Sequence, residues 1–142
     1  MVKIKKYKNW KEVITMTNLL YSKDHEWVQQ LEVNRVRIGI SDYAQHALGD
    51  IVFVENPEVD SEVKANETVG SIESVKAVSD LITPVSGAVV SVNEELEDAP
   101  QSINEQPFDG GWIFEVELSD SEELKGLLSE EEYKAFISEG EE

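Results

Sequence analysis

Lys76 is the residue whose type and setting most suggest chemistry. It is the only basic residue between Lys64 and Lys125, in a stretch that contains many acids. The runs on either side, residues 69–74 and 77–82, have the alternating pattern of β-strands, and no glycine or proline lies between them. The chain must therefore reverse tightly at Lys76 and present its amine to solvent. An ordinary exposed lysine is the alternative that spacing alone leaves open.

Few other residues offer catalytic or metal-binding chemistry. The chain has no cysteine, which excludes disulfides, thiolate nucleophiles and cysteine-based metal sites. His25 and His46 are the only histidines, too few for a histidine-rich zinc cage. We expect His25 to be structural and His46 to be a solvated helix residue. The composition thus argues against a conventional catalytic centre.

The charge of the chain restricts its partners. Asp and Glu number 30 against 12 Lys and Arg, a net charge of −18. Such acidity argues against nucleic acid and against anionic membrane surfaces. No apolar run approaches the roughly 18 residues that a membrane span needs. The length of 142 residues, 40% of them hydrophobic, suits one folded domain.

The N-terminal segment differs from the rest of the chain. Residues 1–15 hold five lysines and a single acid, whereas the chain from Met16 onward has 7 basic and 29 acidic residues, a net charge of −22. We expect residues 1–15 to be a non-domain extension and residues 16–142 to form one domain. Codons for residues 11–13 can spell a bacterial ribosome-binding sequence before Met16, so a translated leader is one explanation. A native basic tail is the other.

Short strands separated by turn residues dominate the body of the chain. Alternating or continuous apolar runs predict strands at residues 35–40, 51–54, 69–74, 77–82, 89–92 and 112–118. Ser41 or Asp42 can cap a short helix that runs to Leu48, and Gly49 can end it. The sequence therefore predicts a mainly β fold with a short internal helix.

Helical spacing replaces strand spacing after residue 118. Ser119 with Glu122, and Ser129 with Glu132, have the spacing of two capping boxes. The apolar residues of this segment recur at helical intervals, and we expect them to pack against the sheet. The chain should thus end in helices.

The sequence contains two similar segments. Residues 49–60 align with residues 87–98, with Gly, Val, Val and Asp in common at the first, fourth, sixth and last places. Two copies suit a small β structure of two similar halves, each giving a strand to the other. Chance similarity between two glycine-led valine strands is the alternative.

The segment around Lys76 resembles the lipoyl-attachment region of the glycine cleavage system H protein family. The resemblance rests on Glu73-Ser74-Val75-Lys76-Ala77-Val78-Ser79-Asp80, followed by Pro84-Val85-Ser86-Gly87. Residues 21–28, 38–45, 48–55 and 111–112 also resemble signature blocks of that family, so the resemblance covers about residues 18–138. Asn56 departs from it, since the family usually has an apolar residue there.

The resemblance implies a fold and a cofactor. The fold would be the barrel-sandwich hybrid of lipoyl and biotinyl domains, mainly β, with two quasi-equivalent halves, a short internal helix and C-terminal helices. Lys76 would carry lipoic acid in amide linkage at a hairpin tip. Glu73 and Gly87 match positions favoured by lipoylating enzymes and by the domain's geometry. Biotinyl domains instead place methionine on both sides of the lysine, where this chain has Val75 and Ala77.

The resemblance also implies a function and partners. The protein would be a non-catalytic carrier that takes the aminomethyl group of glycine from a pyridoxal-phosphate glycine decarboxylase to a folate-dependent aminomethyltransferase. It would pass electrons to dihydrolipoyl dehydrogenase, and lipoate-attaching enzymes would modify it. Glu26 and Asp80 match positions that line a cleft for the loaded arm, and Asp24 occupies the neighbouring position. Carboxylates there would receive the ammonium of the cargo.

Two other functions remain open at this point. Some members of the family relay a lipoyl or octanoyl group to the carrier domains of 2-oxoacid dehydrogenases, and this role would use the same Lys76. An unmodified acidic interaction domain is the third reading. For all three we expect a monomer without nucleic acid, metal or membrane, in the bacterial cytoplasm rather than the mitochondrial matrix.

Overall fold

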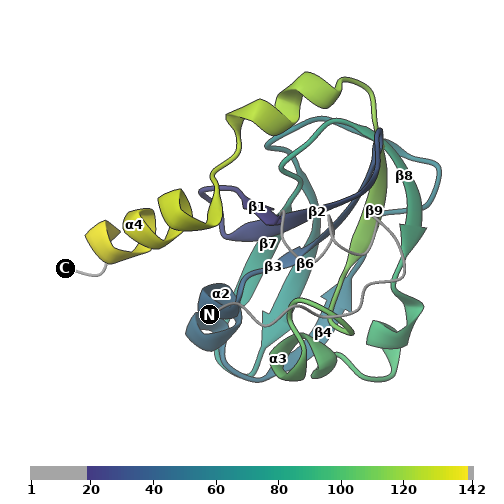
Figure 1. Cartoon of the computed structure of the whole chain (residues 1–142). Coiled ribbons are helices and arrows are strands. Elements are labelled where there is room, and N and C mark those ends of the chain that lie inside the picture. The colour runs from purple at the N-terminus through teal and green to yellow at the C-terminus, as the bar shows by residue number, and fades with distance from the viewer. Residues whose placement is uncertain (1–18, 141–142) are drawn as a thin grey trace, which may run out of the picture.

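The computed structural model describes residues 19–140, which form two antiparallel β-sheets (Figure 1). The expected extension at residues 1–15 lies outside this range. The six-stranded sheet has the order β1-β2-β3-β9-β8-β5, and the three-stranded sheet has the order β4-β6-β7. The strands are β1 (Leu19–Tyr21), β2 (Glu26–Glu32), β3 (Arg35–Ile40), β4 (Ile51–Glu55), β5 (Glu62–Val63), β6 (Thr68–Ser74), β7 (Val78–Ile82), β8 (Gly87–Val92) and β9 (Phe114–Leu118).

Five short helical segments connect or follow the strands. They are α2 (Asp42–Leu48), η1 (Glu94–Glu97), α3 (Ser102–Glu105), η2 (Ser121–Gly126) and α4 (Glu130–Gly140), of which η1 and η2 are 3-10 helices. The last of them, α4, extends outward beside β1 (Figure 1). The expected mainly β fold with a short internal helix and C-terminal helices is confirmed.

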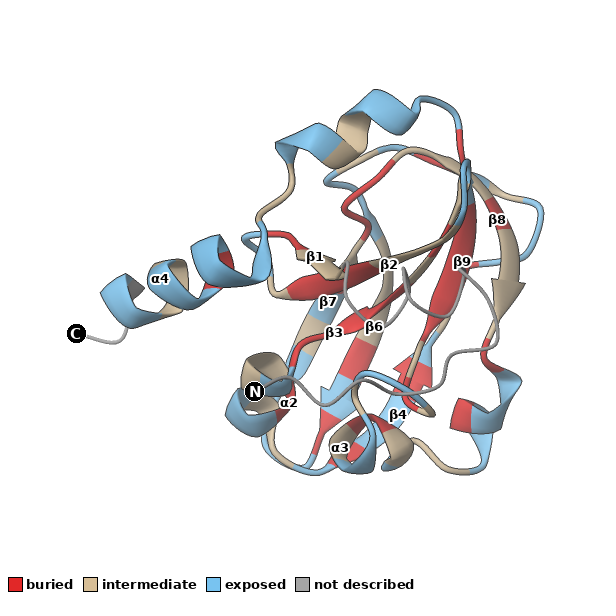
Figure 2. Cartoon of the chain, in the orientation of Figure 1, coloured by how far each residue is buried: buried red, intermediate tan, exposed pale blue. Residues whose placement is uncertain are grey.

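The hydrophobic core forms where the inner faces of the two sheets meet. Val36 and Ile38 of β3 pair with Val116 and Phe114 of β9, and all four are fully buried. The buried stretches of β2, β3 and β9 stand out in Figure 2. Residues of the three-stranded sheet, such as Ile72, belong to the same cluster. Each fully buried side chain of this kind contributes about 1.5–3 kcal/mol, so the core holds the two sheets together.

Helix α2 begins and ends at the residues that the sequence indicated. The Oγ of Ser41 accepts a hydrogen bond from the N–H of Ala44 at 3.1 Å, so Ser41 rather than Asp42 is the N-cap. Gly49 ends the helix with φ 84°, a left-handed conformation that favours glycine. Only Gly49 and Asp50 therefore separate this helix from β4.

The C-terminal segments confirm one predicted capping box and contradict the other. The N–H of Ser129 donates to the side chain of Glu132 at 2.9 Å, and the N–H of Glu132 donates to Ser129 Oγ at 3.1 Å. The box predicted at Ser119 is wrong, because Asp120 caps η2 by accepting from the N–H of Glu122. The N-cap lies one residue later than predicted, because aspartate caps a helix as well as serine does.

The apolar stripe of the C-terminal segment packs inward, as expected. Leu124 and Leu127 pack against the main core. Tyr133 is buried with Tyr21 and Trp27 in a second cluster, which Leu128, Phe136 and Ile137 partly cover. The segment before α4 also pairs with β1, because Tyr21 and Leu128 exchange both backbone hydrogen bonds. The C-terminal end is thus fastened to the edge of the six-stranded sheet.

The two copies of the internal repeat lie in different sheets. The first contains β4 of the three-stranded sheet, and the second contains β8 of the six-stranded sheet. Ile51 and Val89, which the alignment matches, are both buried in the common core. The two corresponding strands thus lie in different layers of the domain and share one core.

Candidate functional site

Lys76 lies at the tip of the hairpin formed by β6 and β7, and Ser74 closes the turn. The N–H of Ser74 donates to the carbonyl of Ala77 at 2.8 Å. Ser74 Oγ accepts from the N–H groups of Lys76 and Ala77 at 3.2 and 3.1 Å. Because the buried side chain of Ser74 satisfies these donors, the turn needs neither glycine nor proline.

The hairpin tip is also tied to the segment between α2 and β4. The N–H of Val75 donates to the carbonyl of Asp50 at 3.0 Å. A Cβ placed on Gly49 would lie 3.4 Å from Cε of Lys76 and 3.9 Å from its Cδ. The aliphatic stem of Lys76 therefore runs over the end of α2, while the residue as a whole stays exposed. This lysine is well placed to carry an acyl group into solvent.

Glu73 and Asp80 lie on the outer face of the three-stranded sheet. Glu73 pairs with Phe53 on one side and with Val78 on the other. Asp80 follows Val78 by two residues on the same strand, so its side chain points to the same face. Both acids are exposed. They flank the hairpin that carries Lys76.

Gly87 follows the end of β7 opposite to the hairpin tip, and its contacts are with the other sheet. Its φ is 155°, and a Cβ built there would meet the carbonyl oxygen of Glu117. Only glycine lets β8 approach β9 this closely. Gly87 therefore positions two strands of the domain rather than the lysine itself.

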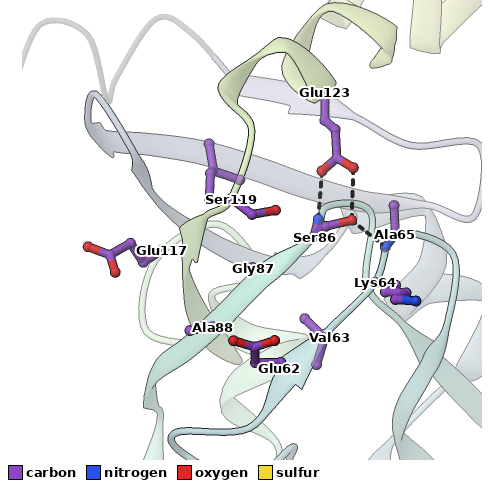
Figure 3. A pocket seen from close by; sticks show the side chains of 11 residues that line it. Glu62, Val63, Lys64, Ala65, Ser86, Gly87, Ala88, Glu117, Ser119 and Glu123 are labelled. Atoms are coloured by element: carbon purple, nitrogen blue, oxygen red, sulfur yellow. Dashed lines mark hydrogen bonds between the residues drawn. The ribbon is translucent and has the colours of Figure 1, made fainter.

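A polar groove of about 660 Å³ surrounds Gly87 (Figure 3). Glu123 of η2 reaches into it, where its carboxylate accepts from the N–H of Ser86 at 2.7 Å and from the Ser86 hydroxyl at 2.8 Å. Ser86 Oγ in turn accepts from the N–H of Ala65 at 2.9 Å. These bonds dock η2 onto the loop before β8, which gives the groove a structural explanation.

Glu26 is the most perturbed acid of the described chain. Its side chain is 3% exposed and accepts a hydrogen bond of 2.6 Å from the hydroxyl of Ser22. Burial raises the pKa of Glu26 to about 8, and the nearby charge of Asp24 acts in the same direction. Glu26 is therefore mostly protonated at pH 7. Asp24 itself is exposed.

A network of polar groups lies beside Glu26 and was not predicted. The hydroxyl of Tyr133 lies 2.8 Å from Nδ1 of His25 and 2.7 Å from Oγ of Ser41. Burial lowers the pKa of His25 below 6.5, so its ring is neutral at pH 7. His25 has φ 74°, packs tilted against Tyr43 and is part of this network, as a structural histidine would be. By contrast, His46 is exposed on α2.

An aromatic groove of about 410 Å³ opens above this network. Its apolar walls come from β1, the start of α2, the segment before β9 and α4, and comprise Tyr21, Tyr43, Phe108, Tyr133 and Ile137. Glu26 lies near Tyr133, whose pKa is raised mainly by burial and also by the charge of Glu26. Of the three predicted cleft acids, Asp24 lies near enough to Glu26 for its charge to act on the Glu26 carboxyl. Asp80 lies on β7 of the three-stranded sheet, where it pairs with Ser71.

The part of the chain that the structure describes also bears on metals and membranes. It contains no group of three or more histidine, aspartate or glutamate side chains that could hold a metal ion. None of the helices between residues 19 and 140 is both long and apolar enough to cross a membrane.

The two packed antiparallel sheets, each with one copy of the internal repeat, and the lysine at a hairpin tip define the barrel-sandwich hybrid of lipoyl and biotinyl domains. A family model described as glycine cleavage H-protein matches residues 19–140. The chain therefore belongs to the glycine cleavage H-protein family.

Individual relatives agree with the family model. The chain is 56% identical over 120 residues to the glycine cleavage system H protein of Oceanobacillus iheyensis, covering 84% of this chain and 94% of that protein. It is 55% identical over 124 residues to the one from Coprothermobacter proteolyticus, covering 87% and 98%. The crystal structure of a glycine cleavage system H protein from Mycobacterium marinum superposes with a TM-score of 0.79 and 39% identity, covering 85% and 97%.

Proposed function

We propose that this protein is the lipoyl-bearing carrier of the glycine cleavage system and that Lys76 is its attachment residue. The observation that carries the proposal is the exposed Lys76 on a hairpin tip fixed by Ser74 and by the bond from Val75 to Asp50. An attached group would move by rotation of its own bonds while its anchor stays in place. Membership in the glycine cleavage H-protein family supports the same assignment.

The residues around Lys76 fit a lipoyl group. Lys76 is exposed at the hairpin tip, and its stem lies over Gly49. When bound, a lipoyl group supplies a disulfide that accepts the aminomethyl group of glycine together with two electrons. The protein would carry this cargo from the decarboxylase to the aminomethyltransferase and the electrons to dihydrolipoyl dehydrogenase. The chain itself supplies the anchor, the orientation and the shelter.

Glu26 is the residue we propose to receive the ammonium of the cargo, with Asp80 and Asp24 as exposed charges that attract it. Glu26 is buried, accepts a hydrogen bond from Ser22 and is mostly neutral at pH 7. A cation beside it would favour the ionised carboxylate and lower its pKa. Loading should therefore release a proton from Glu26 and create a charge-assisted bond only when cargo is present.

The test of the attachment residue is a mass spectrum of intact protein made in cells that synthesise lipoate. The native chain should be heavier by one lipoyl or octanoyl group, and Lys76→Arg should lack this mass while retaining its melting temperature, because an exposed lysine adds little to stability. Lys64→Arg, which changes another exposed lysine, is the matched control and should keep the added mass. An added mass that survives in Lys76→Arg would refute the assignment.

A further inference from the structure

A patch of exposed apolar side chains surrounds the hairpin tip. Val52 and Phe53 of β4 are 48% and 54% exposed, and Val75 and Val78 beside Lys76 are 68% and 67% exposed. We refer to these four residues as the tip patch. Exposed apolar groups that gather in one place, rather than singly, mark sites of interaction.

The backbone holds the tip patch together. The pairing of β4 with β6 is irregular between Ile51 and Phe53, and both Val52 and Phe53 are exposed whereas Ile51 is buried. Phe53 pairs with Glu73, which pairs with Val78, so these three side chains form one row across the outer face. Val75 belongs to the turn at the end of this row. The patch is therefore a fixed surface on the sheet.

Acidic residues border the tip patch. Asp50, Glu55, Glu73 and Asp80 are exposed, and Glu55 and Asp80 lie in the row next to that of Phe53. Lys76 is the only basic residue of the segment from residue 65 to residue 124. The surface around the lysine thus combines an apolar centre with a negative border. A complementary partner would present an apolar contact surrounded by arginine or lysine side chains.

We propose that the tip patch is the docking surface for the enzyme that acylates Lys76, an inference that rests on the proposed function. Acylation requires the Lys76 amine itself to enter the partner's active site. There the ammonium nitrogen loses two protons and forms an amide bond with the acyl carbon of an acyl adenylate, while the bond from that carbon to the phosphate oxygen breaks and AMP leaves with that oxygen. Because the unmodified lysine side chain is much shorter than the acylated arm, this partner must cover the residues next to Lys76.

Partners that act on the finished arm meet a different requirement. The atoms on which these partners act lie at the far end of the arm. Such partners can therefore reach the reacting atoms without covering Val52 and Phe53. The acylating enzyme is therefore the occupant that geometry favours. A partner of the loaded carrier, or a second copy of this chain, would reveal itself in the test below.

The test uses two double variants of the full-length protein, Val52→Ser with Phe53→Ser and Val75→Ser with Val78→Ser. The control is Val33→Ser with Val59→Ser, which removes two exposed valines elsewhere on the protein. A lipoate-attaching enzyme, lipoate and ATP are supplied, and acylation is followed by intact mass. We expect kcat/KM to fall about tenfold or more in both tip variants, mainly through KM, and to stay within twofold in the control. Melting curves verify that the variants fold.

A second measurement identifies the occupant. Variants fully lipoylated by long incubation are assayed for glycine–CO2 exchange with the decarboxylase, and we expect rates within twofold of the native protein. Unchanged acylation, an equal loss in both assays, or a loss in exchange alone would overturn the assignment to the acylating enzyme. So would sedimentation showing a dimer that only the tip variants lose. If the native protein is not acylated at Lys76 at all, the proposed function fails instead.

Discussion

The hydroxyl oxygens of Ser41 and Tyr133 lie 2.7 Å apart, although 92 residues separate them in the sequence. Ser41 caps α2, and Tyr133 belongs to α4. The Tyr133 ring also stacks on Tyr21 of β1 with centroids 4.3 Å apart. One tyrosine therefore fastens the C-terminal helix to both the internal helix and the edge of the larger sheet.

Removing the hydroxyl of Tyr133 should loosen this attachment. Tyr133→Phe keeps the ring stack but leaves His25 and Ser41 with one hydrogen bond fewer. We expect a loss of about 1–2 kcal/mol in the free energy of unfolding, measured by urea denaturation. Tyr43→Phe is the control, because the Tyr43 hydroxyl makes no hydrogen bond within residues 19–140. Equal stability of the two variants would show that the Tyr133 network contributes nothing.

Glu26 should make stability depend on pH in a defined direction. Its pKa is raised from 4.5 to about 8, so between these values the folded state binds more protons than the unfolded state. The stability that this group contributes is thus present below about pH 4.5 and is lost as pH rises towards 8, with a slope of at most about 1.4 kcal/mol per pH unit. Glu26→Gln should therefore gain stability relative to the native protein between pH 5 and pH 8.

The matched control for this pH series is Glu73→Gln, which removes the same charge from an exposed position. Unfolding free energies at several pH values supply the measurement. His25 acts in the opposite direction, since its pKa is lowered and its contribution is lost as pH falls below 6.5. Only the difference between each variant and the native protein isolates Glu26. A difference that does not change with pH would contradict a buried, protonated Glu26.

Gly87→Ala should disrupt the pairing of β8 with β9. The new Cβ would meet the carbonyl oxygen of Glu117, and the backbone has φ 155°. We expect a loss of about 3 kcal/mol or more, because backbone strain and overpacking act together. Gly126→Ala is the control, since a Cβ there meets nothing within 4 Å. Thermal unfolding of both variants is the measurement, and a comparable melting temperature would argue against the close approach.

Ionic strength should affect the encounter with partner enzymes. From Met16 onward the chain carries a net charge of −22, and the predicted partners would present complementary positive charge. Association rates measured by stopped flow should fall steeply as salt rises towards 1 M, where the Debye length is about 3 Å. Rates that are independent of salt would leave solubility as the only effect of this acidity.

Local patterns predicted the elements that local chemistry determines. Ser41, Gly49 and Ser129 act at helix ends through contacts within four residues, and period-two runs indicated most strands. The tight turn at Lys76 was predicted from two strand patterns that have no glycine or proline between them. These features depend on neighbours in sequence, which a sequence displays directly.

Contacts between distant segments were not predictable in this way. In the sequence, Tyr133 could be recognised only as one apolar residue of a helical stripe. Its hydrogen bond to His25 was not predictable, because the two residues lie 108 positions apart. Glu26 begins a strand, and nothing in its neighbourhood indicates that it is buried and protonated. The irregular pairing of β4 likewise turns Val52 and Phe53 outward, although a continuous apolar run suggests a buried strand. Tertiary packing decides all three.

The fixed hairpin tip affects how tightly the protein surface must bind a group carried on Lys76 in order to shelter it. Since Ser74 and Asp50 hold the anchor, a group on Lys76 would be confined near the protein by a short tether. Such tethering corresponds to an effective concentration in the millimolar range. A shelter with a dissociation constant of about 1 mM, equivalent to only about 4 kcal/mol, would then be about half occupied. Even such weak local affinity would shelter a carried group about half of the time, and the same weakness would let a partner enzyme withdraw it.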